Sequence, residues 1–407
     1  MAYLAPAGTK VSLGDIAGGV LGSTFGRADA SRDSLVAALE RLSGLPHVWP
    51  VSSGRAAMVL ILEAMHDLAR QSPAATRDEV IVPAYTCYSV PAAIERAGLK
   101  PRLCDVDPTT LGIDVDALAR HDFSRTLGVI SANLYGVPND LERLEQLCRE
   151  RGALLLDDSA QSLGARLGAR AVGAFGDAGL YSFDKGKIIS TMQGGAIVCR
   201  EGPLAAAVAR RVAALPASAP AEAFGNFAKL VVYSVFLRPG LYGLIRALPF
   251  TGLGQTPYET RYPITTLTRF QSNVAARLLG RLDSLNDARR VNAARLEAAL
   301  TDLPGVTLPS RPAGALPVFA RFPLRIADAA RRAAALARLD AAGIGATASY
   351  PSALCDVPEV ATKLPAADRD CPGARAVAAS ILTLPTHAYC PPDLAARVRE
   401  ILAQVLA

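Results

Sequence analysis

Residues 181–195, "YSFDKGKIISTMQGG", bring two lysines close to a pair of glycines. A neutral lysine amine can attack an aldehyde or ketone and form an imine, so a lysine held inside a site can do covalent chemistry. Gly194 and Gly195 allow the chain to turn sharply beside such a group. Lys185 and Lys187 are therefore both candidates for a covalent role.

Three other segments offer groups that a single ligand could use. Asp158 ends the apolar run "ALLLDD", and Gln161 follows it by three residues. Open α/β sheets bind ligands at the ends of such strands. Ser53 and Gly54, in "SSGRAA", stand where a long helical pattern begins, and free N–H groups at a helix start can bind a phosphate. Ser182 adds a hydroxyl at the end of another apolar run.

One cofactor, pyridoxal 5'-phosphate (PLP), uses all these groups together. A lysine forms a Schiff base with its aldehyde, a carboxylate keeps its pyridine nitrogen protonated, and N–H and hydroxyl groups bind its phosphate ester. Each feature alone has a simpler explanation, as a strand-end cap, a helix cap or a solvated lysine. Their order along the chain favours a PLP site.

Strand and helix patterns alternate along the part of the chain that carries these residues. Continuous apolar strands separated by helices are typical of a mainly parallel sheet that is buried on both faces. We therefore predict an α/β fold with a large domain over residues 1–260, which holds the site, and a smaller C-terminal α+β domain over residues 261–407. The expected strands of the large domain lie in residues 79–85, 100–107, 126–136, 152–158, 177–184 and 194–200, and a helical pattern runs over 268–303.

Composition narrows the class of protein. The chain has 407 residues, of which 51% are hydrophobic and 20% charged, which excludes a disordered or coiled-coil protein. Its net charge of +6 is spread along the chain, so we predict no nucleic-acid partner. The seven cysteines are scattered without C-x-x-C pairs, which argues against a disulfide framework and a metal site. We see no secretory signal and expect a cytoplasmic location.

Four blocks of the sequence also resemble a known family. They are "VPAYTCYSVPAAIERAGLKPRLCDVDPTTLGID", "DDSAQSLGA", "YSFDKGKIISTMQGGAIV" and "ILTLPTHAYCPPDL". In this order, and over most of the chain, they are similar to the DegT/DnrJ/StrS sugar aminotransferases, which are fold-type I PLP enzymes of the aspartate aminotransferase superfamily. The resemblance implies a seven-stranded sheet, PLP as cofactor and transamination as activity.

The resemblance also selects one of the two lysines. In that family the Schiff-base lysine lies four residues after the Phe of a Ser-Phe motif and seven before the first Gly of a Gly-Gly pair. Counting from Phe183 and from Gly194 gives Lys187 both times. Lys185 is then a neighbour whose charge lies in solvent or near the phosphate. Family members with histidine at this position are sugar dehydratases, so the lysine favours transamination.

The same matching assigns the other residues of the site. It implies that Asp158 pairs with the pyridine nitrogen, that Gln161 contacts the ring's 3' oxygen, and that Ser182 binds the phosphate together with the backbone of Gly54 and Arg55. Ser53 belongs to the same phosphate site. Where an aromatic residue usually stacks on the pyridine ring, the sequence has Cys87, between Tyr85 and Tyr88, so the stacking partner stays open.

Several positions depart from the family pattern. Arg55 replaces a common Thr, Asn133 stands where His is frequent, and Gln193 replaces an acidic residue. A motif that reaches the partner subunit's phosphate is missing near residues 262–271. The departures leave the acceptor open. His387, in "LPTHAY", is expected to be structural, with a place near the substrate as the alternative.

The resemblance thus predicts a homodimeric aminotransferase that moves an amino group from glutamate to a keto-sugar nucleotide or related carbonyl compound, in polysaccharide or secondary-metabolite biosynthesis. The alternatives are other PLP chemistry, such as dehydration, racemisation or amination of a non-sugar or lipid-like carbonyl, a PLP-binding regulator without turnover, and a plain nucleotide-binding protein. The apolar segment 225–253 is expected to form helices against the large domain or a partner subunit; contact with a membrane or a lipid-linked acceptor is its alternative.

Overall fold

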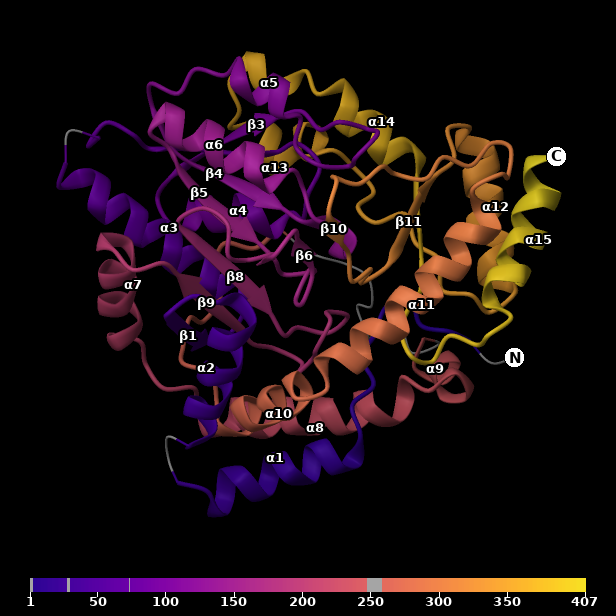
Figure 1. Cartoon of the computed structure of the whole chain (residues 1–407), viewed down its shortest axis with the longest axis horizontal. Coiled ribbons are helices and arrows are strands. Elements are labelled where there is room, and N and C mark those ends of the chain that lie inside the picture. Colours follow the sequence, from indigo (N-terminus) through magenta and orange to yellow (C-terminus); the bar gives the residue numbers. More distant parts are fainter. Residues whose placement is uncertain (1–2, 28–29, 73, 247–257) are drawn as a thin grey trace.

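A seven-stranded sheet forms the centre of the computed structural model, which describes residues 3–27, 30–72, 74–246 and 258–407 (Figure 1). The strand order is β1-β9-β8-β5-β4-β2-β3. Strand β9 is antiparallel to both of its neighbours, and the other neighbouring pairs are parallel, which confirms the predicted mainly parallel sheet. The strands are β1 (His47–Val51), β2 (Glu79–Pro83), β3 (Lys100–Cys104), β4 (Thr126–Ala132), β5 (Leu154–Asp158), β8 (Ala178–Ser182) and β9 (Gly195–Cys199).

The inner strands are buried along their whole length, as the continuous apolar runs predict. Every residue of β4, β8 and β9 is buried, because helices cover both faces of the sheet. Each predicted run is longer than the strand within it; around β2, β3 and β4 the extra residues follow the strand, before β5 they precede it, and around β8 and β9 they lie at both ends. Strand β1 comes from the Pro- and Gly-containing break before "SSGRAA".

Helices pack on both faces of the sheet (Figure 1). One face carries α3, α4 and α7, and the other carries α2, α5, α6 and α10. The expected helical pattern over 268–303 divides near Gly280 into α10 and α11. These helices are α2 (Ala30–Ser43), α3 (Gly54–Arg70), α4 (Ser89–Arg96), α5 (Val115–Ala119), α6 (Leu141–Arg151), α7 (Pro203–Ala213), α10 (Arg269–Leu279) and α11 (Leu282–Leu300).

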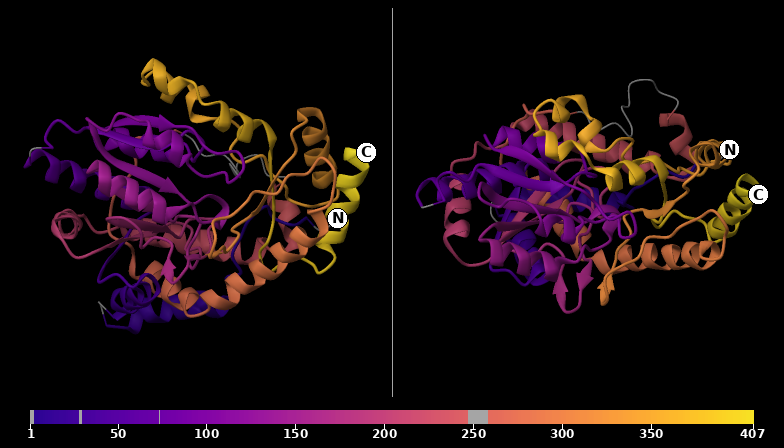
Figure 2. Two further views of the ribbon diagram at one scale, coloured as in Figure 1. Left: turned by 45° about the horizontal axis from the view of Figure 1, so that its top comes forward. Right: turned by 90° about the horizontal axis from the view of Figure 1, so that it is seen from above.

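The C-terminal elements form a second core at one end of the molecule, shown in orange and yellow in Figure 2. Helix α11 leads into this core, where β11 pairs with β12. The segment with α13 and α14 instead extends back over the sheet and packs in the core of α3 and α4. The division at residue 260 stays a prediction. The elements are β11 (Phe322–Arg325), α12 (Ala329–Ala341), α13 (Pro358–Ala361), α14 (Pro372–Ser380), β12 (Ile381–Leu384) and α15 (Leu394–Leu406).

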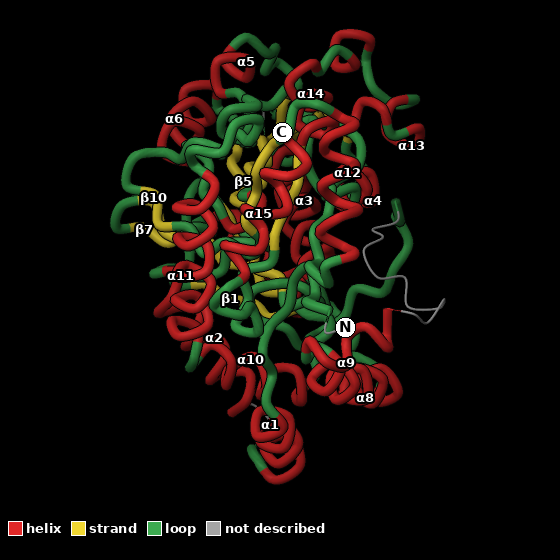
Figure 3. Tube along the Cα trace, turned by 90° about the vertical axis from the view of Figure 1, so that its right-hand side faces the viewer, coloured by secondary structure: helices red, strands yellow, loops and turns green. Residues whose placement is uncertain are grey.

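Three helices lie together at another end of the molecule (Figure 3). They are α1 (Leu13–Phe25), α8 (Pro220–Phe236) and α9 (Pro239–Arg246), and α1 and α8 both pack against α10. Helices α8 and α9 agree with the helices expected in 225–253, of which residues 247–253 lie outside the described part of the chain. A small sheet of β10 (Ala315–Leu316), β6 (Arg166–Leu167) and β7 (Arg170–Ala171) completes the fold.

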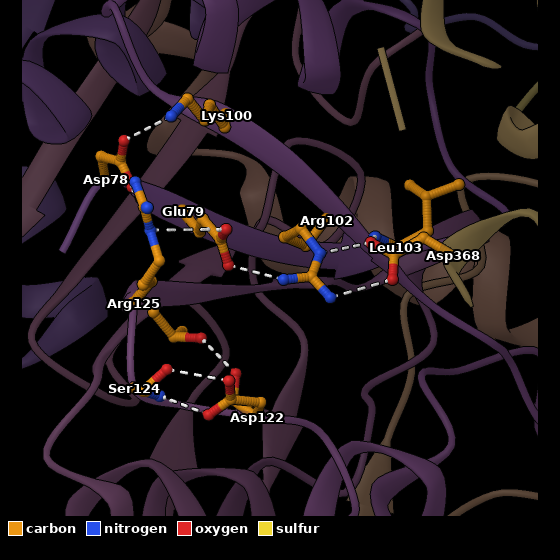
Figure 4. A network of polar contacts seen from close by, with 10 residues as sticks. Asp78, Glu79, Lys100, Arg102, Leu103, Asp122, Ser124, Arg125 and Asp368 are labelled. Atoms are coloured by element: carbon orange, nitrogen blue, oxygen red, sulfur yellow. Dashed lines mark hydrogen bonds and ion pairs between the residues drawn. The ribbon is translucent and has the colours of Figure 1, made fainter. Parts of the chain in front are cut away.

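Charged residues bind the amino ends of β2, β3 and β4 together, at the edge away from the predicted site (Figure 4). Arg102 donates to Asp368 through Nε at 2.6 Å and through Nη2 at 3.1 Å, and to Glu79 through Nη1 at 2.6 Å. Asp368 is buried and also accepts the backbone N–H of Leu103. These two carboxylates raise the pKa of Arg102 above its ordinary value. Arg102 therefore ties the C-terminal segment around Asp368 to the sheet.

Replacing Arg102 with methionine is expected to lower the free energy of unfolding by about 3 kcal/mol, because the buried Asp368 would lose its charged partner. Equilibrium unfolding in urea measures this change. Arg125→Met is the matched control, since Arg125 pairs with Asp78 at 2.6 Å from a half-exposed position, where an ion pair contributes less. Equal losses in the two variants would contradict the role given to Arg102.

Candidate active site

The predicted cofactor residues gather at the carboxyl ends of the central strands. Asp158 is the last residue of β5 and Ser182 is the last residue of β8, which is its neighbour in the sheet. The loop 183–194, which joins β8 to β9, begins at the same edge and carries both lysines. Parallel sheets bind ligands at this edge. The structure thus brings together residues that lie up to thirty positions apart.

The two lysines differ in their surroundings. Lys185 is exposed, and its backbone N–H donates to Asp184 Oδ1 at 2.8 Å. Lys187 is half-buried, and its positive charge opposes the rise that burial causes in the pKa of Asp158. The choice of Lys187 over Lys185 stays a prediction.

The adjacent acids Asp157 and Asp158 have different roles. Asp157 is fully buried and accepts four hydrogen bonds, from Asn133 Nδ2 at 2.6 Å, Gly173 N at 2.6 Å, Phe175 N at 3.3 Å and Ser159 Oγ at 3.3 Å. These donors hold the loop after β5 in place. Asp157 thus belongs to the fold, although burial raises its pKa to about 6.

Asp158 is also buried but has a freer carboxylate. Among the described residues, its carboxylate accepts one hydrogen bond, from Ala160 N to Oδ1 at 3.0 Å. Burial raises the pKa of Asp158, while the Ala160 N–H and the Lys187 ammonium oppose the rise. Its second oxygen is therefore the one that can accept a proton donor such as a pyridinium N–H.

The start of α3 and the end of β8 meet at Gly195. Gly195 pairs with Val51 in β1 and with Ser182 in β8, so these strands hold the first turn of α3 against Ser182. A Cβ atom at Gly54 would lie 2.8 Å from Ser182 Cβ, and one at Gly195 would lie 2.6 Å from Gly54 N, so both positions need glycine. The Ser182 hydroxyl thus lies beside a helix start, an arrangement that suits a phosphate.

The side chains of Ser53 and Arg55 are engaged by other groups of the protein. Ser53 Oγ accepts from Ala56 N at 3.0 Å and caps α3, which leaves the first-turn N–H groups of Gly54 and Arg55 without partners inside the helix. Arg55 Nη1 donates to Glu259 Oε2 at 2.9 Å, and its guanidinium lies 4.4 Å from the ring centre of Tyr262. The backbone role predicted for Arg55 therefore does not need its side chain.

Tyrosines surround Gln161. Gln161 Oε1 accepts from Tyr135 N at 3.0 Å, and its Nε2 donates to the Tyr350 hydroxyl at 3.2 Å. The backbone carbonyl of Tyr350 accepts from the Tyr85 hydroxyl at 3.1 Å. Burial raises the pKa of Tyr350, so it stays protonated and can donate. The C-terminal part of the chain thus reaches the predicted site through Tyr350.

Cys87 stands where the resemblance expects a residue that stacks on the cofactor ring. Its half-buried sulfur accepts from Ser89 Oγ at 2.9 Å. The ring of Tyr88 lies 5.9 Å from that of Tyr350 and tilted by 44°. The role of Cys87 in cofactor binding stays a prediction.

Thr9 supports the backbone of the loop that carries Lys187. Thr9 Oγ1 lies 2.7 Å from the carbonyl oxygen of Lys187 and 2.9 Å from that of Ile188. The backbone N–H of Thr9 donates to the hydroxyl of Tyr233, on α8, at 2.8 Å. Arg289, buried on α11, donates to the carbonyl of the residue before Thr9 at 2.8 Å. The N-terminal segment, α8 and α11 therefore together support the backbone of Lys187.

His387 lies in the same buried region. Its Nε2 is 2.9 Å from the carbonyl oxygen of Ala5, and since a carbonyl only accepts, Nε2 carries the proton. Burial lowers the pKa of His387 to about 4, so the ring is neutral. Its contact is with the N-terminal segment, which agrees with the structural role expected for it.

Asn133 and Gln193, two departures from the family pattern, have structural contacts. Asn133 holds Asp157 through its side chain and donates its backbone N–H to the Asp158 carbonyl at 3.1 Å. The carbonyl of Gln193 accepts from Gln271 Nε2 at 2.8 Å, and the Gln193 residue itself is exposed. Both residues thus support the loops next to Asp158 and Gly194.

Sequence reasoning missed Thr9, Tyr135 and Tyr350. Tyr135 had a usable signal, because it follows an apolar run in "ANLYG" at a strand end. Thr9 and Tyr350 lie in segments without periodicity or motif, and only tertiary contacts bring them to the site.

The residues present fit PLP. The glycine-lined start of α3 beside Ser182 suits its phosphate, and the freer carboxylate of Asp158 suits its ring nitrogen. The half-buried Lys187 acts on Asp158 from the same edge of the sheet. Helices on both faces of a mainly parallel sheet, with a strand-end aspartate and a lysine-bearing loop at one edge, are features that a PLP-binding transferase uses.

The chain belongs to the DegT/DnrJ/EryC1/StrS aminotransferase family, whose model matches residues 19–403. The crystal structure of an aminotransferase, TlmJ, from Streptoalloteichus hindustanus is similar over 99% of this chain and 98% of that chain, with a TM-score of 0.78 and 25% identity. Both findings confirm the predicted family and fold.

Two relatives with named activities are similar to this chain over different shares of its length. The L-glutamine:2-deoxy-scyllo-inosose aminotransferase of Streptomyces fradiae is 30% identical over 64% of this chain. The match spans 54% of that relative's length. The UDP-N-acetyl-3-dehydro-alpha-D-glucosamine 3-aminotransferase of Acidithiobacillus ferrooxidans is 27% identical over 92% of this chain and 88% of its own length.

Proposed function

We propose that the protein is a PLP-dependent aminotransferase that transfers an amino group from an amino acid to the keto group of a sugar nucleotide or related cyclic polyol. The observation that carries the proposal is that the loop of Lys187 begins at the strand edge that holds Asp158 and Ser182, where Ser182 meets the glycine-lined start of α3. Family membership supports the same activity.

Each residue has a defined task in this reaction. PLP supplies an aldehyde that condenses with amines and a protonated ring that accepts the electron pair released at the donor's α-carbon. The freed, neutral amine of Lys187 removes the α-proton and returns it on the cofactor side. The Asp158 carboxylate keeps the ring nitrogen protonated. Gln161 orients the ring through its amide, and Ser182 and the α3 N–H groups hold the phosphate.

The choice of substrates rests on the relatives. One of them is named for 2-deoxy-scyllo-inosose and another for a UDP-linked keto-hexosamine, and both acceptors are ring ketones with several hydroxyl groups. We propose an acceptor of this class, in polysaccharide or secondary-metabolite synthesis. Glutamate is the proposed donor, and the glutamine named for the first relative is its alternative.

The half-reaction with the donor tests this proposal. Enzyme loaded with PLP is mixed with glutamate or glutamine, without acceptor, and the keto acid is quantified. We expect about one keto acid per active site and then no further release, because the second half-reaction needs an acceptor. Addition of a keto-sugar nucleotide should restart release. No keto acid from either donor would contradict the proposal and favour dehydration or a non-catalytic role.

Two further proposals concern assembly and compartment. A homodimer is proposed because the resemblance implies fold-type I sites built between two subunits. All seven cysteines are free thiols, which supports a reducing cytoplasm.

A further inference from the structure

Helix α1 turns its apolar side outward. Leu13, Leu21 and Phe25 are 61%, 58% and 82% exposed, and Val20 lies between them on the same side. These residues recur at helical spacing, so they form one continuous stripe. The helix's acid, Asp15, is buried and accepts from Arg281 Nη2 at 2.6 Å. The exposed stripe of α1 therefore carries no charge.

The inward side of α1 explains this orientation. A Cβ atom at Gly18, Gly19 or Gly22 would lie 2.3 Å, 2.5 Å or 2.5 Å from side chains of α10. The helix thus docks through its glycines, which permit a very close approach. If α1 were rotated to bury its large apolar residues, these side chains would clash with α10, which leaves room only for glycine at the contact. The outward stripe is therefore built into the packing of the two helices.

Helix α8, which packs beside α1, carries two further exposed apolar residues. Phe224 is 70% exposed and Val232 is 46% exposed. The ring centre of Phe224 lies 6.3 Å from that of Phe227, which packs edge-on at 5.5 Å against Phe270 of α10. Phe270 in turn contacts the glycine side of α1. Figure 3 shows α1 at one end of the molecule with α8 beside it.

We call this surface the α1–α8 face, made of Leu13, Val20, Leu21, Phe25, Phe224 and Val232. It holds six of the eight large apolar residues that are exposed in the described part of the chain. Isolated exposed leucines are ordinary, but this clustering marks an interaction site.

The exposed charges in the two segments that carry the α1–α8 face have one sign. In segments 10–27 and 219–243 every exposed charged residue is a cation: Lys10, Arg27, Lys229 and Arg238. Glu222 is half-buried. A symmetric contact between two copies would place this cationic surface against itself. An apolar surface with a cationic rim instead complements a bilayer with anionic headgroups.

We propose that the α1–α8 face docks the protein on the surface of an anionic membrane, without crossing it. No helix within the described ranges is both long and apolar enough to span a bilayer. Phe25 and Leu21 enter the boundary between headgroups and acyl chains, and the cations bind the headgroups. The amphipathic segment of a membrane-surface protein has this distribution of groups.

Vesicle flotation tests the proposal with the full-length protein. We expect binding to vesicles of phosphatidylcholine and phosphatidylglycerol in equal parts, and little binding to phosphatidylcholine alone. Leu21→Glu combined with Phe25→Glu should lower binding about tenfold or more, because it places two anions in the docking surface. Lys229→Ala should lower it about fivefold. Val291→Glu is the matched control, because Val291 is 50% exposed on α11, and should leave binding unchanged.

Thermal unfolding of each variant checks that the fold is kept, and Phe25→Ser serves as a milder second variant. Light scattering of the same samples gives the oligomeric state. Absence of binding to anionic vesicles, or equal binding of the double variant, would overturn the proposal. Loss of a dimer in the double variant without vesicle binding by the wild type would assign the α1–α8 face to a contact between copies. The assay needs no turnover, so its outcome is independent of the proposed transamination.

Discussion

Lys187→Ala is expected to abolish amino transfer, with a loss in turnover of at least about ten-thousandfold, because the variant lacks both the amine that bonds the cofactor and the base that moves the proton. Lys187 is half-buried at the strand edge and its charge reaches Asp158, whereas Lys185 is exposed. Lys185→Ala is the matched control, since it removes an identical amine two positions away. It should keep its activity within about threefold.

Two measurements check this result. Initial rates of keto acid formation give the loss of turnover. Borohydride reduction of the PLP-loaded protein, followed by mass spectrometry of its peptides, locates the covalent attachment. We expect the added mass on Lys187 in the wild type and no attachment in Lys187→Ala. Attachment at Lys185, or a Lys187→Ala variant with near-normal rates, would show that the spacing argument selects the wrong residue.

Asp158→Asn is expected to lower the rate at least about a hundredfold while the protein stays folded. The amide cannot keep a pyridine nitrogen protonated, but the carboxylate that it replaces has a single hydrogen bond from the described residues, so little structure depends on it. Burial raises the pKa of Asp158. The ionised form is the active one, so the wild-type rate should fall with acid at a pH above the ordinary aspartate value, and the residual rate of Asp158→Asn should lack this step.

Asp157→Asn is the variant with which Asp158→Asn should be compared. Asp157 accepts four hydrogen bonds, two of them from the backbone N–H groups of Gly173 and Phe175. An amide NH₂ facing those donors would leave buried groups unpaired, at about 2 kcal/mol or more. Urea unfolding should show this loss for Asp157→Asn and a smaller one for Asp158→Asn. The opposite order would exchange the roles of the two acids.

Sequence alone predicted the parts of the fold that depend on local pattern. The runs around β2, β4, β5, β8 and β9 are continuous and apolar because helices cover both sheet faces, and that requirement is visible in the residues. Asp158 and Ser182 were recognisable because each ends such a run. Gly54 and Gly195 were placed in turns, but their close mutual contact needed the structure.

Other parts could not be predicted. An apolar stripe on a helix ordinarily indicates a buried face, whereas α1 buries its glycines and exposes Leu21 and Phe25. Thr9 and Tyr350 reach the site through contacts that join residues far apart in the sequence. No local pattern encodes such contacts, since each depends on how the whole chain packs.

The position of Thr9 also determines when the site can form during synthesis. Its hydroxyl meets the carbonyl of Lys187, 178 residues later, and the neighbouring Ala5 meets His387, 382 residues later. Translation makes the chain from its amino end, so Ala5 is made long before its partner His387. The N-terminal segment that supports the lysine loop therefore gains its contact with His387 only when the polypeptide is almost complete, and a nascent chain that ends before His387 lacks that contact.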